Sequence, residues 1–209
     1  MRFLTLTYAD ENLVRNDQGF PVLHKRHMQL FFKTLRRKSD YLAATSEWNE
    51  GREPDRQYKP LPIRYYCVGE YSQDYRPHYH AIVFNIPPEL DAQIHMEKIW
   101  KHGIVNYQTP RSAKAISYVT KYLTKVDTRD IKAMGLTPPY NQMSLGLGKS
   151  YINNQTVKYH SSIENFAYTR KHGNVRRLPE YLLKKLHNLD DPNERLKLKL
   201  STTRQTRDM

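Results

Sequence analysis

The chain has 209 residues, of which 38% are hydrophobic, so its length allows one domain with a buried core and a smaller appendage. Lys and Arg number 34 against 21 Asp and Glu, a formal net charge of +13, which favours a polyanionic partner. The 16 tyrosines among these cations favour unpaired nucleic acid, because bases stack on aromatic rings. The single cysteine, Cys67, excludes an intrachain disulfide framework, and no segment reaches the ~18 apolar residues of a membrane span. We therefore expect a soluble intracellular protein.

The first 62 residues predict a strand, a helix and a long loop. Residues 3–8, Phe-Leu-Thr-Leu-Thr-Tyr, alternate apolar and hydroxyl side chains as a strand does. Within residues 25–38 the apolar positions follow the i, i+3, i+4, i+7 spacing of an amphipathic helix, namely Met28, Phe31, Phe32 and Leu35. Residues 45–62 are polar, contain three prolines and lack a period, so we expect a loop.

The next segments predict a hairpin, a second helix and a fourth strand. Residues 63–71 and 78–86 are apolar, β-branched and aromatic runs separated by a turn-rich connection. Residues 89–101 have helical spacing, Gly103 is expected to end that helix, and residues 104–107 form a short strand. The order β-α-β-β-α-β predicts an α+β fold with a ferredoxin-like, palm-type antiparallel sheet and its helices on one face.

The C-terminal part has weaker patterns. Residues 112–126 predict one more helix appended to the sheet, and residues 128–159 read as irregular structure. Residues 179–189 are helical in pattern, and the tail from Asp190 is highly charged. We therefore divide the chain into a catalytic domain at 1–127 and an accessory region at 128–209, partly irregular and partly helical.

Three residues of the predicted hairpin form a candidate metal site. His78 and His80 are two apart on one strand, so both imidazoles project from the same face. An isolated His-x-His pair is more often structural than metal-binding. Glu70 lies on the preceding strand, and a register that sets it opposite His78 or His80 would add its carboxylate. Two imidazoles and a carboxylate admit Zn²⁺, Mn²⁺ or Mg²⁺ on ligand type alone.

The predicted helix at 112–126 carries candidate nucleophiles. Tyr118 and Tyr122 are i, i+4, so both phenols lie on one face and can address one phosphate, and Lys121 and Lys125 share that face. A phenol has a pKa of about 10 and needs a nearby cation to act as a nucleophile. The competing interpretation is that the lysines only face water and that one tyrosine packs or stacks.

The motifs together resemble the HUH endonuclease superfamily, most closely the replication-associated initiators of microviruses, which are small single-stranded DNA phages. They lie, in order, at residues 3–8, 69–71, 76–82, 100–103 and 118–122. The resemblance implies a palm-like sheet, Mg²⁺ or Mn²⁺ held by Glu70, His78 and His80, and nucleophiles at Tyr118 and Tyr122. It also implies rolling-circle replication in the cytoplasm of a bacterial host.

We therefore expect a site-specific single-stranded DNA endonuclease that forms a covalent 5′-phosphotyrosine. Its partners would be a single-stranded DNA origin and a host helicase and polymerase, with no membrane. The DNA backbone would be held by Lys33, Arg36, Arg37, Arg76 and the accessory region. Two alternatives remain open: a plasmid relaxase or transposase of the same superfamily, and a non-catalytic module that binds single-stranded nucleic acid.

Overall fold

The computed structural model describes residues 1–45, 50–53, 61–110, 128–171 and 174–207. The helix predicted at residues 112–126 lies outside the described residues. The chain divides into two compact units, Met1–Leu145 and Gly146–Met209. No helix of the described part combines the length and the apolar character required to cross a bilayer.

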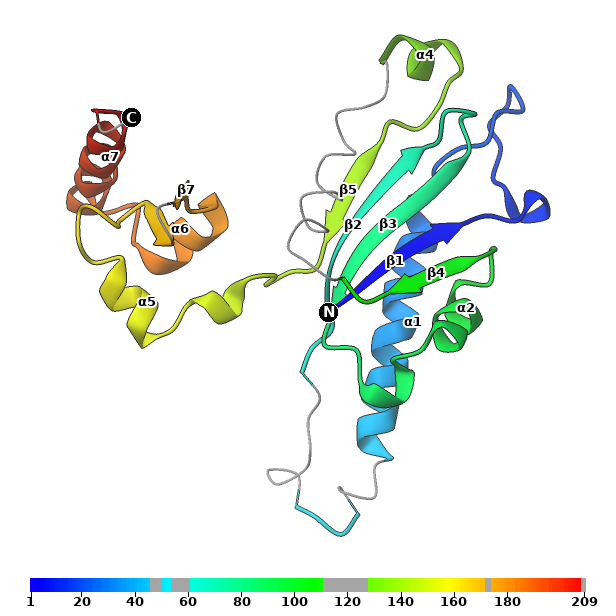
Figure 1. Cartoon of the computed structure of the whole chain (residues 1–209), viewed down its shortest axis with the longest axis horizontal. Helices are drawn as coiled ribbons and strands as arrows, with labels where there is room; N and C mark the ends of the chain where they lie inside the picture. Colours follow the sequence, from blue (N-terminus) through cyan, green and yellow to red (C-terminus); the bar gives the residue numbers. More distant parts are fainter. Residues whose placement is uncertain (46–49, 54–60, 111–127, 172–173, 208–209) are drawn as a thin grey trace. The chain divides into compact units, whose positions relative to one another are not determined.

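The first unit is built on a five-stranded antiparallel sheet (Figure 1). Its strand order is β4-β1-β3-β2-β5, in which every neighbouring pair is antiparallel. The strands are β1 (Arg2–Thr7), β2 (Arg64–Tyr71), β3 (Pro77–Phe84), β4 (Val105–Gln108) and β5 (Tyr140–Met143). The first four match the strands predicted from sequence and have the split β-α-β arrangement of ferredoxin-like sheets, so the predicted α+β class is confirmed.

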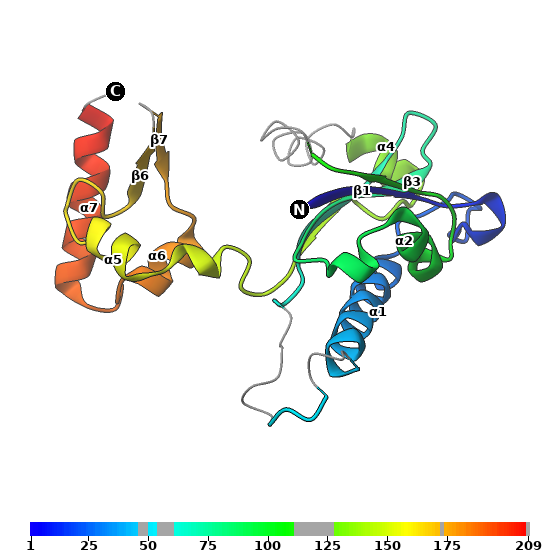
Figure 2. The ribbon, with the colours of Figure 1, turned by 60° about the horizontal axis from the view of Figure 1, so that its bottom comes forward.

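Two helices, α1 (Lys25–Ala44) and α2 (Gln93–Trp100), cover one face of this sheet (Figure 2). The stripe predicted on α1 is buried, and Ser39 and Ala43 continue it, which explains why the helix is longer than expected. The same core contains Leu4 and Leu6 of β1 and Tyr79, Ala81 and Val83 of β3. Alternation therefore places the intervening residues of both strands on the face opposite α1 and α2.

The end of α2 differs from the sequence interpretation. The helix ends where Lys101 adopts the left-handed conformation, with φ 56°. Gly103 lies beyond that point and has another role, because a Cβ there would be 2.4 Å from the carbonyl oxygen of Thr7. The glycine permits the loop after α2 to approach the backbone of β1 closely.

The first compact unit extends to Leu145, whereas the sequence placed a division at residue 127. The cause is β5, which pairs with β2 from the segment expected to be irregular. Ser144 strengthens this pairing, since its amide donates to the carbonyl of Tyr65 and its Oγ accepts from the amide of Tyr65, both at 3.0 Å. The short helix α4 (Thr128–Ala133) precedes β5, and two 3₁₀ helices lie at Asp10–Asn12 and Pro88–Leu90.

The second unit has its own small core beneath a two-stranded hairpin. Its buried residues are Ala167, Leu178 and Leu183. Its elements are a 3₁₀ helix at Lys149–Tyr151, α5 (Asn154–Tyr159), β6 (Tyr168–Lys171), β7 (Asn174–Arg177), α6 (Glu180–Leu186) and α7 (Pro192–Arg207). The helix predicted at 179–189 is confirmed by α6, and the charged tail forms α7.

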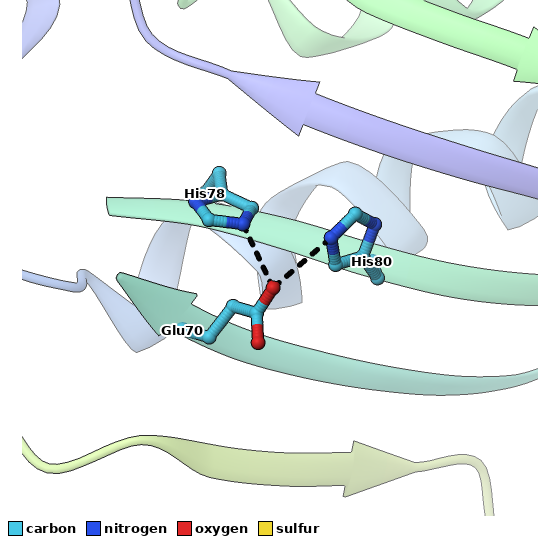
Figure 3. Close-up of side chains that lie close together, drawn as sticks. All are labelled: Glu70, His78 and His80. Atoms are coloured by element: carbon cyan, nitrogen blue, oxygen red, sulfur yellow. Dashed lines mark hydrogen bonds and ion pairs between the residues drawn. The ribbon is translucent and has the colours of Figure 1, made fainter. Parts of the chain in front are cut away.

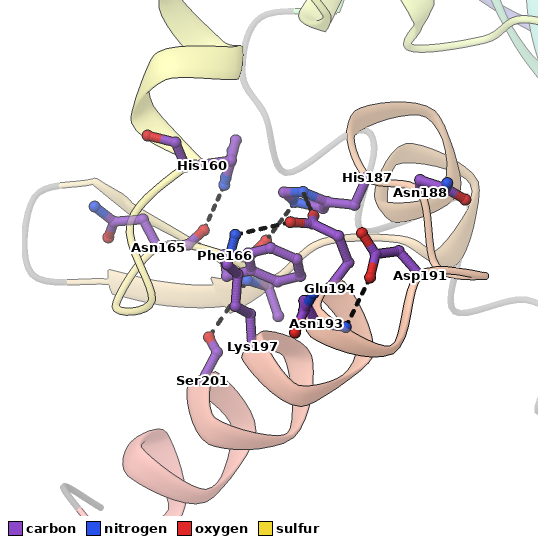
Figure 4. Close-up of polar contacts among 12 residues, drawn as sticks. His160, Asn165, Phe166, His187, Asn188, Asp191, Asn193, Glu194, Lys197 and Ser201 are labelled. Carbon is purple, nitrogen blue, oxygen red and sulfur yellow. Dashed lines mark hydrogen bonds and ion pairs between the residues drawn. The ribbon is translucent and has the colours of Figure 1, made fainter.

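Polar contacts fasten α7 to the hairpin of this unit (Figure 4). The amide of Ala167 donates to Oγ of Ser201, and Nδ1 of His187 lies 3.3 Å from the Glu194 carboxylate. Nε2 of His187 contacts the carbonyl of Phe166 at 3.1 Å while the two rings stack. Because both ring nitrogens face acceptors, His187 links α6, β6 and α7 in one network.

Candidate metal centre

The three predicted ligands meet on the face of the sheet opposite α1 and α2. The β2–β3 register pairs Glu70 with His78 and Val68 with His80. Cross-strand partners share a face, and His78 and His80 are two residues apart on β3. Figure 3 shows all three side chains pointing toward one another from the two strands of the hairpin.

The geometry suits a single cation. Oε1 of Glu70 lies 2.8 Å from Nε2 of His78 and 3.1 Å from Nε2 of His80. One ligand atom from each residue lies within 4.8 Å of the other two. Two ligands at ~2.1 Å from one ion are at most about 4.2 Å apart, so small side-chain rotations would bring all three into coordination. The donor set, two imidazoles and one carboxylate, fits a divalent ion and leaves coordination positions open.

The electrostatics of the site favour a cation. Glu70 is 4% exposed and His80 is 7% exposed. Burial raises the pKa of Glu70, but the hydrogen bonds from His78 and His80 lower it more, so the pKa lies below its ordinary value. The carboxylate is therefore charged at neutral pH in a place with little access to water, and positive charge beside it is stabilising.

The proton on His78 is placed by the main chain. Its Nδ1 lies 3.2 Å from the carbonyl oxygen of Arg76. A carbonyl only accepts, so Nδ1–H donates, and in the neutral ring the lone pair is then on Nε2, which faces Glu70. The turn before β3 holds that carbonyl in position, since the amide of Arg76 donates to Oγ of Ser72 at 3.1 Å. Such outer contacts are a usual feature of metal-binding histidines.

Sequence reasoning missed two residues that support His80. Oγ1 of Thr5 lies 3.0 Å from its Nδ1, and the ring of Phe3 stacks on it at 5.6 Å with an interplanar angle of 13°. Alternation along residues 3–8 already placed Phe3 and Thr5 on one face of a strand. Which strand lies beside them depends on the order β1-β3, and the period of a single strand carries no information on that order.

The structure separates the expected DNA-contacting residues from the ligands. Lys33 and Arg37 are exposed on α1, on the other side of the sheet from Glu70. Arg36 packs over the Tyr65 ring at 5.3 Å.

Arg76 is near the ligands but is engaged within the protein. Its guanidinium donates to the Asp10 carboxylate at 2.5 Å and to the carbonyl of Tyr8 at 2.6 Å. It thereby joins the turn before β3 to the segment that follows β1. The predicted nucleophile residues Tyr118 and Tyr122, with Lys121 and Lys125, lie outside the described residues.

Comparison with known proteins identifies the family. The model of the replication-associated protein ORF2 family matches residues 1–127, which include the four-strand core of the sheet and all three candidate ligands. The replication-associated protein ORF2 of Spiroplasma virus 4 is 31% identical over 167 residues, which are 72% of this chain and 46% of that protein. The chain thus spans less than half of the length of that relative. No solved structure matches the chain. Since the family match covers more than half of its residues, the chain belongs to the replication-associated protein ORF2 family.

Proposed function

We propose that this protein is an HUH-type endonuclease and strand transferase that nicks a single-stranded DNA origin and so initiates rolling-circle replication. One observation carries the proposal: Glu70, His78 and His80 converge on one sheet face in a chain of a replication-associated family. Replication initiation requires a free 3′-hydroxyl, and phosphodiester transesterification at a metal centre generates one.

Glu70, His78 and His80 would hold Mg²⁺ or Mn²⁺. The bound ion would polarise a non-bridging oxygen of the scissile phosphate and neutralise charge in the transition state. The residues of the chain contribute the placement of that phosphate beside the buried carboxylate. Because the nucleophile is a side chain, no activated water is required.

Tyr118 and Tyr122 would supply the nucleophile. The phenol oxygen of one tyrosine bonds to phosphorus, the bond to the 3′ oxygen breaks, and a 5′-phosphotyrosine and a 3′-hydroxyl result. The phenol proton passes to solvent, which balances the proton taken up by the leaving oxygen. Lys121 and Lys125 favour the phenolate by their charge. Attack of a 3′-hydroxyl on the phosphotyrosine reverses the reaction and joins the strand.

The second tyrosine would allow alternation. While one phenol carries the 5′-phosphate, its neighbour remains available for the cut that closes a round. The origin strand, a host helicase and a host polymerase are the partners that this role requires, in the cytoplasm of a bacterial host.

The test is covalent capture of DNA. The full chain is incubated with a labelled pool of random single-stranded DNA and Mn²⁺, and protein–DNA adducts that survive denaturation are isolated and sequenced. We expect adducts with wild type and with each single Tyr→Phe variant, and none with Tyr118→Phe/Tyr122→Phe, with His78→Ala or with chelator. DNA binding without any adduct would refute the proposal and favour the non-catalytic single-strand-binding module.

A further inference from the structure

We propose that Thr5 is a positioning residue that holds the His80 imidazole with its Nε2 lone pair facing the metal site. This inference rests on the proposed metal centre. It gives a chemical role to the first motif of the chain, whose part in the function the ligand set alone leaves unexplained.

The proton arrangement on His80 depends on a side chain, unlike that on His78. Oγ1 of Thr5 is 3.0 Å from Nδ1 of His80, and a hydroxyl both donates and accepts. If the hydroxyl donates, Nδ1 keeps its lone pair and Nε2 carries the proton. If the hydroxyl accepts, Nδ1–H is the donor and the Nε2 lone pair faces Glu70. Only the second arrangement leaves Nε2 available to a cation.

The strand register fixes the contact. Thr5 is the direct partner of His80 in the β1–β3 ladder, so the two side chains share a face at the distance set by the sheet. The Phe3 ring stacks on the imidazole and restricts its rotation. Because His80 is 7% exposed, water has little access to replace the hydroxyl at Nδ1.

The chain offers a matched control one ladder position away. Thr7 lies on the same face of β1 and is the direct partner of His78, but its hydroxyl donates to the carbonyl of Ile104 at 3.3 Å. Removing that hydroxyl leaves the Nδ1 contact of His78 intact, since its acceptor is the carbonyl of Arg76.

The experiment measures Mn²⁺ affinity by paramagnetic resonance on the full chain without DNA. Thr5→Val keeps the β-branched shape and removes the hydroxyl, and we expect it to weaken Mn²⁺ binding by about 10- to 100-fold. Thr5→Ser restores a hydroxyl and should bind nearly as wild type, as should Thr7→Val. Thermal unfolding without metal checks that each variant folds, and Thr5→Ala replaces Thr5→Val if the valine variant does not.

The outcomes separate the inference from the proposed function. If wild type binds Mn²⁺ and His80→Ala does not, but Thr5→Val binds as wild type, the positioning role is overturned while the metal centre stands. Equal weakening by Thr5→Val and Thr5→Ser also overturns it, because packing rather than the hydroxyl would then be the cause. If wild type binds no Mn²⁺ at Glu70, His78 and His80, the metal centre and the inference fall together.

Discussion

At the scale of single residues, histidines occur in two different settings in the first unit. His78 and His80 face a carboxylate and have supporting contacts at Nδ1. His24, His27 and His102 instead pack ring against ring on the helix side of the sheet, with ring centroids 4.1 and 4.0 Å apart along the series. Because ligand atoms must converge on an ion, only the first setting suits a metal.

The packed histidines predict acid-sensitive stability. Burial lowers the pKa of His27 to about 4, and repulsion from His102 and His24 adds to the effect. The unfolded chain therefore binds this proton at higher pH, near its ordinary pKa of about 6.5. The stability from neutral His27 is fully present above that value and is lost as the pH falls from about 6.5 toward 4.

The measurement compares melting temperatures at pH 7 and pH 5. His27→Asn retains a polar group toward the Tyr8 hydroxyl, which Nδ1 of His27 contacts at 2.9 Å, and no longer titrates. We expect a smaller loss of melting temperature on acidification in this variant than in wild type. His95→Asn, which removes a histidine outside this group of three, is the control. Identical losses in His27→Asn and wild type would contradict the assignment.

At the scale of elements, the connection from α2 to β4 is set by backbone proximity. The amide of Ala9 donates to the carbonyl of His102 at 2.8 Å, and the amide of Thr7 donates to the carbonyl of Ile104 at 3.0 Å. The indole of Trp100 donates to the carbonyl of Thr7 at 2.8 Å. Three hydrogen bonds thus fasten the end of β1 to this loop, and Gly103 lies between their partners.

Gly103→Ala should destabilise the first unit by roughly 1–3 kcal/mol, because the added Cβ must push backbone atoms apart. The nearest atoms are the carbonyl oxygen of Thr7 at 2.4 Å and the amide nitrogen of Ala9 at 2.6 Å. Urea unfolding followed by tryptophan fluorescence measures the change. Ile104→Ala, at a side chain that is 72% exposed, should change stability by no more than about 0.5 kcal/mol. A Gly103→Ala midpoint equal to that of wild type would show that the loop can move without loss.

At the scale of the whole molecule, the charge of +13 is distributed beyond the candidate metal centre. The second unit contributes 13 Lys and Arg against six Asp and Glu. On the first unit, Lys33 and Arg37 are exposed on α1, on the face of the sheet that the metal ligands do not share. A strand held by both faces would have to pass around the sheet.

This charge distribution predicts a salt-dependent contact on α1. Lys33→Ala/Arg37→Ala should weaken binding of single-stranded DNA and reduce the slope of log K against log salt by roughly 0.7 per lost contact. Lys98→Ala/Lys132→Ala removes the same charge from exposed positions on α2 and α4 and should reduce the slope less. Fluorescence anisotropy over a salt series measures both. If the two double variants have equal slopes, α1 makes no specific contribution.

Local patterns predicted the features that depend on neighbouring residues. Alternation and a turn-rich connection sufficed for the hairpin that brings Glu70 to His78. The contact between Thr5 and His80 joins residues 75 positions apart and could not be derived from either strand alone. Arg36 belonged to a basic cluster in the sequence, but its position on the helix directs it to Tyr65. β5 was missed because Asn141 and Gln142 give it no apolar alternation.

The pairing of β1 has a consequence for synthesis. Its ladder partner His80 is 75 residues after Thr5, and at 5–20 residues per second the ribosome needs roughly 4 to 15 s to add that stretch. During this interval the first strand has emerged without its central neighbour, and its apolar residues Leu4 and Leu6 have no sheet to join. A nascent chain with a basic helix as its next long element stays charged meanwhile, which opposes aggregation until β3 arrives.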